Sequence, residues 1–186
     1  MKNKEQSQQL IKTLLENIGE DTSRAGLIDT PKRCVNMYEE LLSKTNVDPK
    51  EEINTFFESE NDEPILVKDI QFYSLCEHHM LPFYGRVAIA YIPDGEVIGL
   101  SKMARTVEVF AKRLQLQERM TSQIADAFME ELNPKGVMVM IEAEHMCMTM
   151  RGIKKPGTKT VTVMARGSFE NDERLQNTFF RMLEHR

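Results

Sequence analysis

The chain has 186 residues, of which 41% are hydrophobic and 28% are charged, as expected of a soluble globular protein with one core. It contains no apolar run long enough to predict a transmembrane helix. Its net charge of −5 argues against bulk nucleic-acid binding, although local lysines and arginines can still hold a phosphorylated ligand. Residues 1–6 are polar and lack the apolar core of a signal peptide, so we expect a cytoplasmic protein.

Two helices are predicted in the N-terminal part of the chain. Apolar residues recur at helical spacing over residues 6–18, and Gly19 then provides a signal for the helix end. Thr30 and Pro31 are typical of a second helix start, with Thr30 as the N-cap. Residues 44–63 are polar and acidic, which indicates a surface connection.

Strands and helices are predicted in the next part of the chain. Residues 65–74 and 85–92 are rich in valine, isoleucine and aromatic residues, which favours two strands. Two helices follow, the first capped by Ser101 and the second ended by residues 133–136.

A second hairpin and a last helix complete the predicted elements. Residues 137–143 alternate with a period of two, and residues 158–165 form the expected partner strand across a turn at residues 155–157. An amphipathic terminal helix is expected to start near Asn171. Two hairpins separated by a pair of helices predict an α+β domain with a mostly antiparallel sheet.

The character of the sequence changes near Pro64, where the polar connection gives way to strand-forming residues. We therefore expect residues 1–60 to form an N-terminal helical segment. Residues 61–186 are expected to form the main domain as one structural unit.

Histidine and cysteine residues gather in two short segments. In Cys76–His79, Cys76 and His79 have the short spacing of a metal-chelating pair, and His145 and Cys147 lie downstream. If the downstream segment is extended, these two side chains point the same way. Zinc suits this mixture of thiolate and imidazole ligands.

The number of protein ligands distinguishes the kinds of zinc site. A catalytic zinc has three protein ligands and one position for water. If these ligands are Cys76, His79 and Cys147, then His78 and His145 are left for acid–base chemistry. A structural zinc closed by four ligands, and the absence of a metal, remain alternatives at this point.

Several cationic residues could hold a phosphorylated ligand. Ser101 and Lys102 open a predicted helix with Arg105 one turn later, and a helix start with nearby cations favours anions. Arg151 follows the downstream cluster, and Arg33 lies in the first turn of the second helix. Any one of these residues, taken alone, is more typical of a solvated surface.

Glu118 is a candidate for recognising a nucleobase. A carboxylate can accept two hydrogen bonds from the N1–H and amino groups of a guanine-type edge. Taken alone, Glu118 is more typical of an acidic residue favoured by a helix N-terminus.

Together these segments resemble the GTP cyclohydrolase I family from Gly26 to the C-terminus. Several separated motifs occur in the family order, which makes a chance match very rare. The motifs are Gly26–Arg33, Ser74–His79, Ala90–Pro93, Val97–Lys102, Gln115–Arg119 and Glu144–Gly152.

The resemblance implies a zinc-dependent hydrolase that converts GTP and water to 7,8-dihydroneopterin triphosphate and formate, a first step toward tetrahydrofolate and other pterins. It implies zinc ligation by Cys76, His79 and Cys147. It also implies proton transfer by His78, near N7 of the purine, and by His145. The implied substrate contacts are Glu118 and Gln117 for guanine, and Ser101, Lys102, Arg105, Arg151 and Arg33 for the triphosphate and ribose.

The resemblance also implies the tunnelling fold, in which antiparallel sheets backed by helices join into a ring. Two stacked rings of five subunits would give a homodecamer with sites between subunits, and neither a nucleic-acid nor a membrane partner is expected. Two alternatives remain: a non-catalytic zinc-binding module, and a sister tunnelling-fold enzyme that acts on another purine or pterin.

Overall fold

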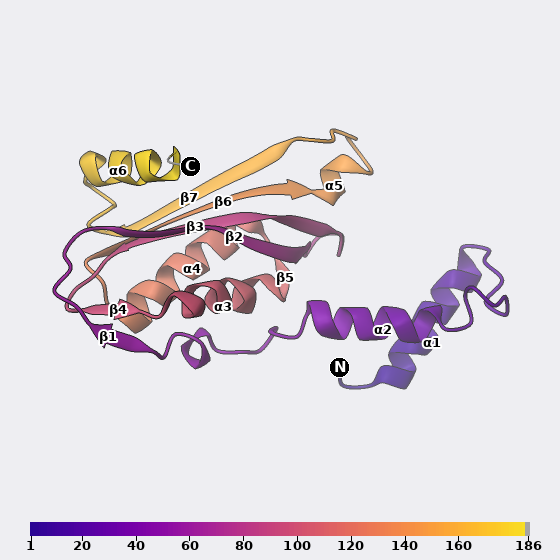
Figure 1. Ribbon diagram of the computed structural model, residues 1–186. Helices are drawn as coiled ribbons and strands as arrows, with labels where there is room; N and C mark the ends of the chain where they lie inside the picture. Colours follow the sequence, from indigo (N-terminus) through magenta and orange to yellow (C-terminus); the bar gives the residue numbers. More distant parts are fainter. Residues whose placement is uncertain (185–186) are drawn as a thin grey trace. The chain divides into compact units, whose positions relative to one another are not determined.

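The computed structural model describes residues 1–184, and the chain forms two compact units, residues 1–43 and 44–186 (Figure 1). The division lies earlier than the expected boundary at residue 60. Residues 44–60 belong with the second unit because Ile53 is buried in its core and strand β1 (Phe56–Glu58) pairs with strand β4 (Glu96–Ile98).

The first unit consists of the two predicted helices, α1 (Lys4–Asn17) and α2 (Thr30–Leu41). Pro31 lies in the first turn of α2, as expected, because its missing N–H costs nothing there. The N-cap of α2 is Asp29 instead of Thr30, which is the first helical residue. The prediction was therefore one residue late at this helix start.

The second unit contains one two-stranded and one five-stranded sheet. The strands of the larger sheet are β2 (Ile65–Cys76), β3 (Pro82–Ile92), β5 (Leu114–Gln115), β6 (Gly136–His145) and β7 (Lys159–Gly167). The helices are the 3-10 helix η1 (Pro49–Glu51) and the α-helices α3 (Leu100–Ala111), α4 (Gln117–Leu132), α5 (Met146–Thr149) and α6 (Glu173–Glu184).

The strand order of the larger sheet is β5-β2-β3-β6-β7. All pairs are antiparallel except the short parallel pair between β5 and β2. Both predicted hairpins, β2–β3 and β6–β7, are confirmed. The α+β class with an antiparallel sheet and helices, expected of a tunnelling fold, is confirmed as well.

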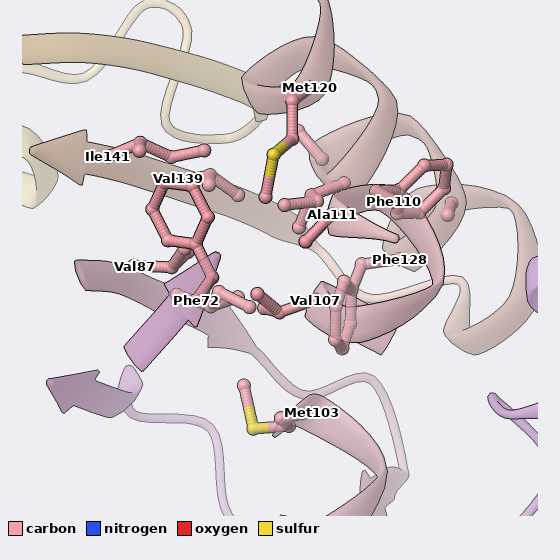
Figure 2. Packing of buried hydrophobic residues seen from close by; sticks show 14 of the residues in the cluster. Phe72, Val87, Met103, Val107, Phe110, Ala111, Met120, Phe128, Val139 and Ile141 are labelled. Carbon is pink, nitrogen blue, oxygen red and sulfur yellow. The ribbon is translucent and has the colours of Figure 1, made fainter. Parts of the chain in front are cut away.

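Helices α3 and α4 cover one face of the sheet and form the main core with it (Figure 1). The predicted alternation in β6 is confirmed, because Val139 and Ile141 point into this core. Figure 2 shows them packed near Met120 and the other buried side chains of the cluster. Full burial of one such side chain stabilises the fold by about 1.5–3 kcal/mol.

Helix α6 packs on the opposite face of the sheet (Figure 1). Phe179 is its buried residue, and it contacts a smaller cluster that includes Ala88, Ala90 and Met138. Among the described residues, no helix combines the length and apolar character needed to cross a membrane.

Candidate metal centre and active site

The first ligand segment is the tight loop that joins β2 to β3. The Cys76 N–H donates to the Leu81 carbonyl at 2.9 Å, and the Cys76 carbonyl accepts from the Met80 N–H at 2.8 Å. Met80 has a positive φ of 52°, in the left-handed region that few residues with side chains adopt. This turn folds the loop back so that His79 approaches Cys76.

The second ligand segment begins where β6 ends at His145. An extended chain here would have placed His145 and Cys147 on one side. The chain is not extended, because it enters the helical turn α5 at Met146. The change of direction lets Cys147 face the first loop while His145 contacts different partners.

The two segments meet at one end of the sheet. Strand β3 lies between β2 and β6, and Phe83 at its start pairs in register with His145. The loop before β3 and the turn after β6 are therefore neighbours. As a result, the sulfur atoms of Cys76 and Cys147 and a ring nitrogen of His79 lie within 4.8 Å of one another.

The donor set and its spacing fit one zinc ion. A tetrahedral zinc, bound at about 2.3 Å to sulfur and 2.0–2.1 Å to nitrogen, holds its ligands about 3.5–4 Å apart. Among residues 1–184, Cys76, His79 and Cys147 are the only group of three or more such residues within metal-binding reach of one another. Cys76 is buried, Cys147 is half-buried and His79 is exposed, so the site opens to solvent on one side.

The electrostatic surroundings of Cys147 also favour a cation. Burial raises the pKa of its thiol, and the neighbouring Cys76 raises it further. Two adjacent thiols resist simultaneous ionisation because their negative charges repel. A bound metal ion removes that conflict, since both sulfurs then ligate as thiolates.

His78 lies beside this group and outside it. Its side chain is exposed, and its Nδ1 is 3.9 Å from the Cys76 sulfur. The ring centroids of His78 and His79 are 6.1 Å apart, with the rings at 78° to each other. His78 can therefore reach a ligand next to the metal position without itself being one of the three donors.

The side chain of His145 packs against two neighbouring side chains, those of Phe83 and Gln117. Its ring stacks on Phe83, with centroids 4.8 Å apart and planes within 1° of parallel. Its Nε2 lies 2.8 Å from Oε1 of Gln117. Burial lowers the pKa of His145, and the nearby carboxylate of Glu118 partly opposes this shift.

Gln117 faces the protein interior, where it is 1% exposed. Its amide nitrogen donates to the Ile141 and Thr160 carbonyls, both at 3.0 Å, and lies 3.1 Å from the Thr162 hydroxyl. Both polar atoms of the amide thus have protein partners. This arrangement does not fit the expected contact of Gln117 with guanine, whereas Glu118 next to it is exposed.

The start of α4 also links to the first ligand loop, a connection that the sequence analysis missed. Arg119 forms an ion pair with Glu77, and it donates to Gln115 Oε1 at 3.1 Å. The Glu77 N–H donates to the Gln115 carbonyl at 3.0 Å.

The expected phosphate contacts divide into separate groups. Arg151 follows α5 and lies close enough to Cys147 to affect the pKa of its thiol. Arg33 is exposed in the first unit, where its guanidinium is 3.6 Å from the Asp29 carboxylate. Ser101, Lys102 and Arg105 lie in the first half of α3.

The length of helix α3 separates Ser101, Lys102 and Arg105 from the metal ligands. Strand β5 follows the end of α3 and pairs with Leu75 and Cys76, so the ligands lie near the helix C-terminus (Figure 1). The 12 residues of α3 span about 18 Å. Lys102 at the helix start therefore lies far from the metal ligands of its own chain.

Comparisons with known proteins agree with the geometry. The profile of the family described as GTP cyclohydrolase I matches residues 7–184. GTP cyclohydrolase 1 of Clostridium kluyveri is 59% identical over 174 residues, covering 94% of each chain. The protein of that name from Clostridium perfringens is 56% identical over 183 residues, covering 98% of this chain and 99% of the relative.

Among solved structures, the apo form of a QueF-like archaeosine synthase is similar, with a TM-score of 0.45 and 17% identity. The match covers 56% of this chain and 94% of that one. The family match and the high identity over nearly the whole length together establish that the chain belongs to the GTP cyclohydrolase I family.

Proposed function

We propose that this chain is a zinc-dependent GTP cyclohydrolase I, which converts GTP and water to 7,8-dihydroneopterin triphosphate and formate. Membership of the family supports the activity. The observation that carries the mechanism is the convergence of Cys76, His79 and Cys147, with two further histidines close by. The product would serve as a precursor of tetrahydrofolate and other pterins.

Zinc and two histidines would share the chemistry. A zinc ion held by Cys76, His79 and Cys147 would supply a bound water with a pKa of about 7. His78, exposed beside Cys76, would donate a proton near N7 of the purine and so make C8 more electrophilic. His145 would transfer protons in the later steps, in which the imidazole ring opens, formate leaves and the pterin ring closes.

Substrate binding would use residues of two kinds. The exposed carboxylate of Glu118 would accept hydrogen bonds from the N1–H and amino groups of guanine. Arg151, next to the ligand cluster, would contact the phosphate and ribose end of the substrate, with Arg33 as a further contact. Binding energy from the unreactive triphosphate would position the purine for reaction.

The remaining phosphate contacts would come from a neighbouring copy of the chain. Ser101, Lys102 and Arg105 are about one helix length from the metal ligands of their own chain. A homo-oligomer that joins the start of one α3 to the ligand end of another would complete the site. We propose a decamer of two stacked five-membered rings, in which pairing between sheets would cover open strand edges.

The alternatives from the sequence have less support. A closed structural zinc site needs a fourth ligand, and among the described residues the group within metal-binding reach contains only Cys76, His79 and Cys147. A sister enzyme with another substrate is disfavoured by the close relatives that share the cyclohydrolase name. A cytoplasmic location remains a prediction.

The test is a GTP assay on protein stripped of metal and then restored with zinc. We expect formate release, and a product that fluoresces after oxidation, only in the zinc-restored sample. Magnesium is a matched control because it prefers oxygen ligands and should not restore turnover. ATP is a second control, since its base lacks the guanine edge that Glu118 would bind. Zinc-loaded protein that releases no formate from GTP would rule out the proposed activity.

A further inference from the structure

The amide of Gln117 has only one favourable orientation. Its nitrogen lies 3.0 Å from two backbone carbonyl oxygens, those of Ile141 and Thr160. If the amide were flipped, its oxygen would face both carbonyls, and acceptors would oppose acceptors in a buried site. Leaving such buried groups without hydrogen bonds costs about 1–3 kcal/mol each. The amide oxygen must therefore be the atom that faces His145.

Two threonine hydroxyls support this orientation. Thr121 donates its hydroxyl hydrogen to the Gln117 main-chain carbonyl at 2.7 Å. Its oxygen lies 2.7 Å from the Thr162 hydroxyl, which can therefore donate to it. The Gln117 amide has only two hydrogens for three acceptors, so the Thr162 oxygen, at 3.1 Å, shares one of them with a backbone carbonyl. Every donor in this buried network then has an acceptor, and the two backbone carbonyls set the direction of its hydrogen bonds.

The orientation of Gln117 determines which nitrogen of His145 carries a hydrogen. An amide oxygen can only accept a hydrogen bond, so Nε2 of His145, at 2.8 Å, must be the donor. Stacking of the imidazole on the buried Phe83 ring fixes the plane in which this bond is made. Among the described residues, Nδ1 of His145 has no hydrogen-bond partner, so it is the ring nitrogen left to contact a ligand.

We propose that Gln117 is a positioning residue that holds His145 with its hydrogen on Nε2 and presents Nδ1 to the substrate. The inference rests on the proposed function for its catalytic meaning. The bond to Gln117 selects this tautomer, so the lone pair of Nδ1 stays available to a bound ligand.

Neutron diffraction from deuterated crystals of the unmodified protein tests the placement directly. The expected result is deuterium on Nε2 of His145, pointing at Oε1 of Gln117. A bare Nε2 would overturn the proposal. This measurement requires no turnover, so it separates failure of the tautomer assignment from failure of the proposed GTP activity.

A variant tests the consequence for catalysis. Gln117→Met keeps a similar side-chain length and removes the acceptor, so we expect kcat to fall at least tenfold, which is part of the 10²–10⁴-fold contribution of an acid–base group. The KM for GTP and the zinc content should change less than about twofold, because in this proposal Gln117 contacts neither the substrate nor the metal ion. Thr121→Val is the matched control, since it breaks the same buried network without touching His145.

The outcomes are distinct. In Thr121→Val we expect kcat within about twofold of the unmodified enzyme, as for the loss of one ordinary hydrogen bond. If Gln117→Met keeps full kcat, Gln117 is only a structural residue and the proposal fails. If KM rises in place of a fall in kcat, Gln117 binds the substrate, and the proposal fails equally. If Gln117→Met does not fold, the neutron result decides.

Discussion

The two ends of α3 carry very different candidate site residues. At its C-terminal end, Cys76, His79 and Cys147 converge from separate segments, and their loop is fixed by backbone hydrogen bonds. At its N-terminal end, Lys102 and Arg105 project from one helix turn, and Arg105 is exposed. In the proposed site, one chain would build the reacting end, whereas the phosphate-binding end would come from a neighbouring copy.

This difference sets how each end responds to mutation. At the proposed ligand end, a side chain would act through geometry, so its loss should remove a function outright. At the start of α3, a side chain would act through charge, and removing one of several charges should weaken phosphate binding by degrees.

Removal of a cysteine ligand should abolish both metal binding and turnover. In Cys147→Ser, we expect zinc to fall from near one per chain to almost none, and kcat to fall by at least about 10²-fold, because a metal supplies several kcal/mol. Metal analysis by mass spectrometry and the GTP assay measure the two effects. Cys34→Ser is the matched control, because Cys34 is a half-buried cysteine on α2 outside the ligand group. Retention of zinc in Cys147→Ser would contradict the ligand assignment.

The adjacent histidines should separate metal binding from catalysis. His78→Ala should keep its zinc and lose about 10²–10⁴-fold in kcat, as expected for a lost acid–base group. His79→Ala should lose the zinc itself, because His79 belongs to the donor group. The two roles would have to be exchanged if His78→Ala lost zinc while His79→Ala retained it.

Local patterns were sufficient to predict the long elements of the fold. The alternation of β6 and the apolar spacing of α4 are properties of adjacent residues, and both were confirmed. Strand β5 has only two residues, and its pairing with β2 depends on the tertiary structure, so no local pattern reveals it. The turn into α5 was missed because its four residues, Met146–Thr149, are too few to show a helical period in the sequence.

The sequence was sufficient to predict the group of residues that could hold a metal ion. It was less informative about the residues that support this group. Cys76, His79 and Cys147 are chemically distinctive residue types, and their approach in space bears out the proximity expected of them. Gln117 is a polar residue at a helix start, where exposure is the usual expectation. Its burial follows from the close packing of α4 on β6 and β7, which a single sequence does not display.

Mixed oligomers should reveal whether the site is shared between copies. Lys102→Met should raise the KM for GTP about tenfold through loss of one charged hydrogen bond. When Lys102→Met and His78→Ala chains are co-expressed, about one site in four should receive an unmodified residue from each partner. Activity at low GTP should then exceed the average of the separate variants.

The control for this experiment lies on the same helix. Lys112 follows the end of α3, where it pairs with Glu108 at 3.5 Å. Lys112→Met should leave the KM for GTP unchanged, because this cation is not at the phosphate-binding end. Activity of the mixed oligomers that equals the average of the two variants would indicate that each chain supplies all of its own contacts.

The smallest expected effect concerns Glu52, a carboxylate that would compete with phosphate for the cations at the start of α3. A hydrogen bond from Lys44, at 3.0 Å, chiefly lowers the pKa of Glu52, and Arg105 and Lys102 lower it further. Because the folded pKa lies below the ordinary value of 4.5, Glu52 stabilises the fold above that pH, and the contribution is lost as the pH falls through the folded pKa.

Glu52→Gln should therefore reduce the free energy of unfolding by about 0.5–1 kcal/mol at pH 7, with a smaller difference from the unmodified protein below about pH 4. Denaturant unfolding at the two pH values measures this change. The same variant removes a negative charge near Lys102 and Arg105, so the KM for GTP should fall about twofold with kcat unchanged. Glu131→Gln breaks the 3.4 Å pair with Lys50 and should not change KM. Equal effects of both variants on KM would mean that these cations do not bind the triphosphate.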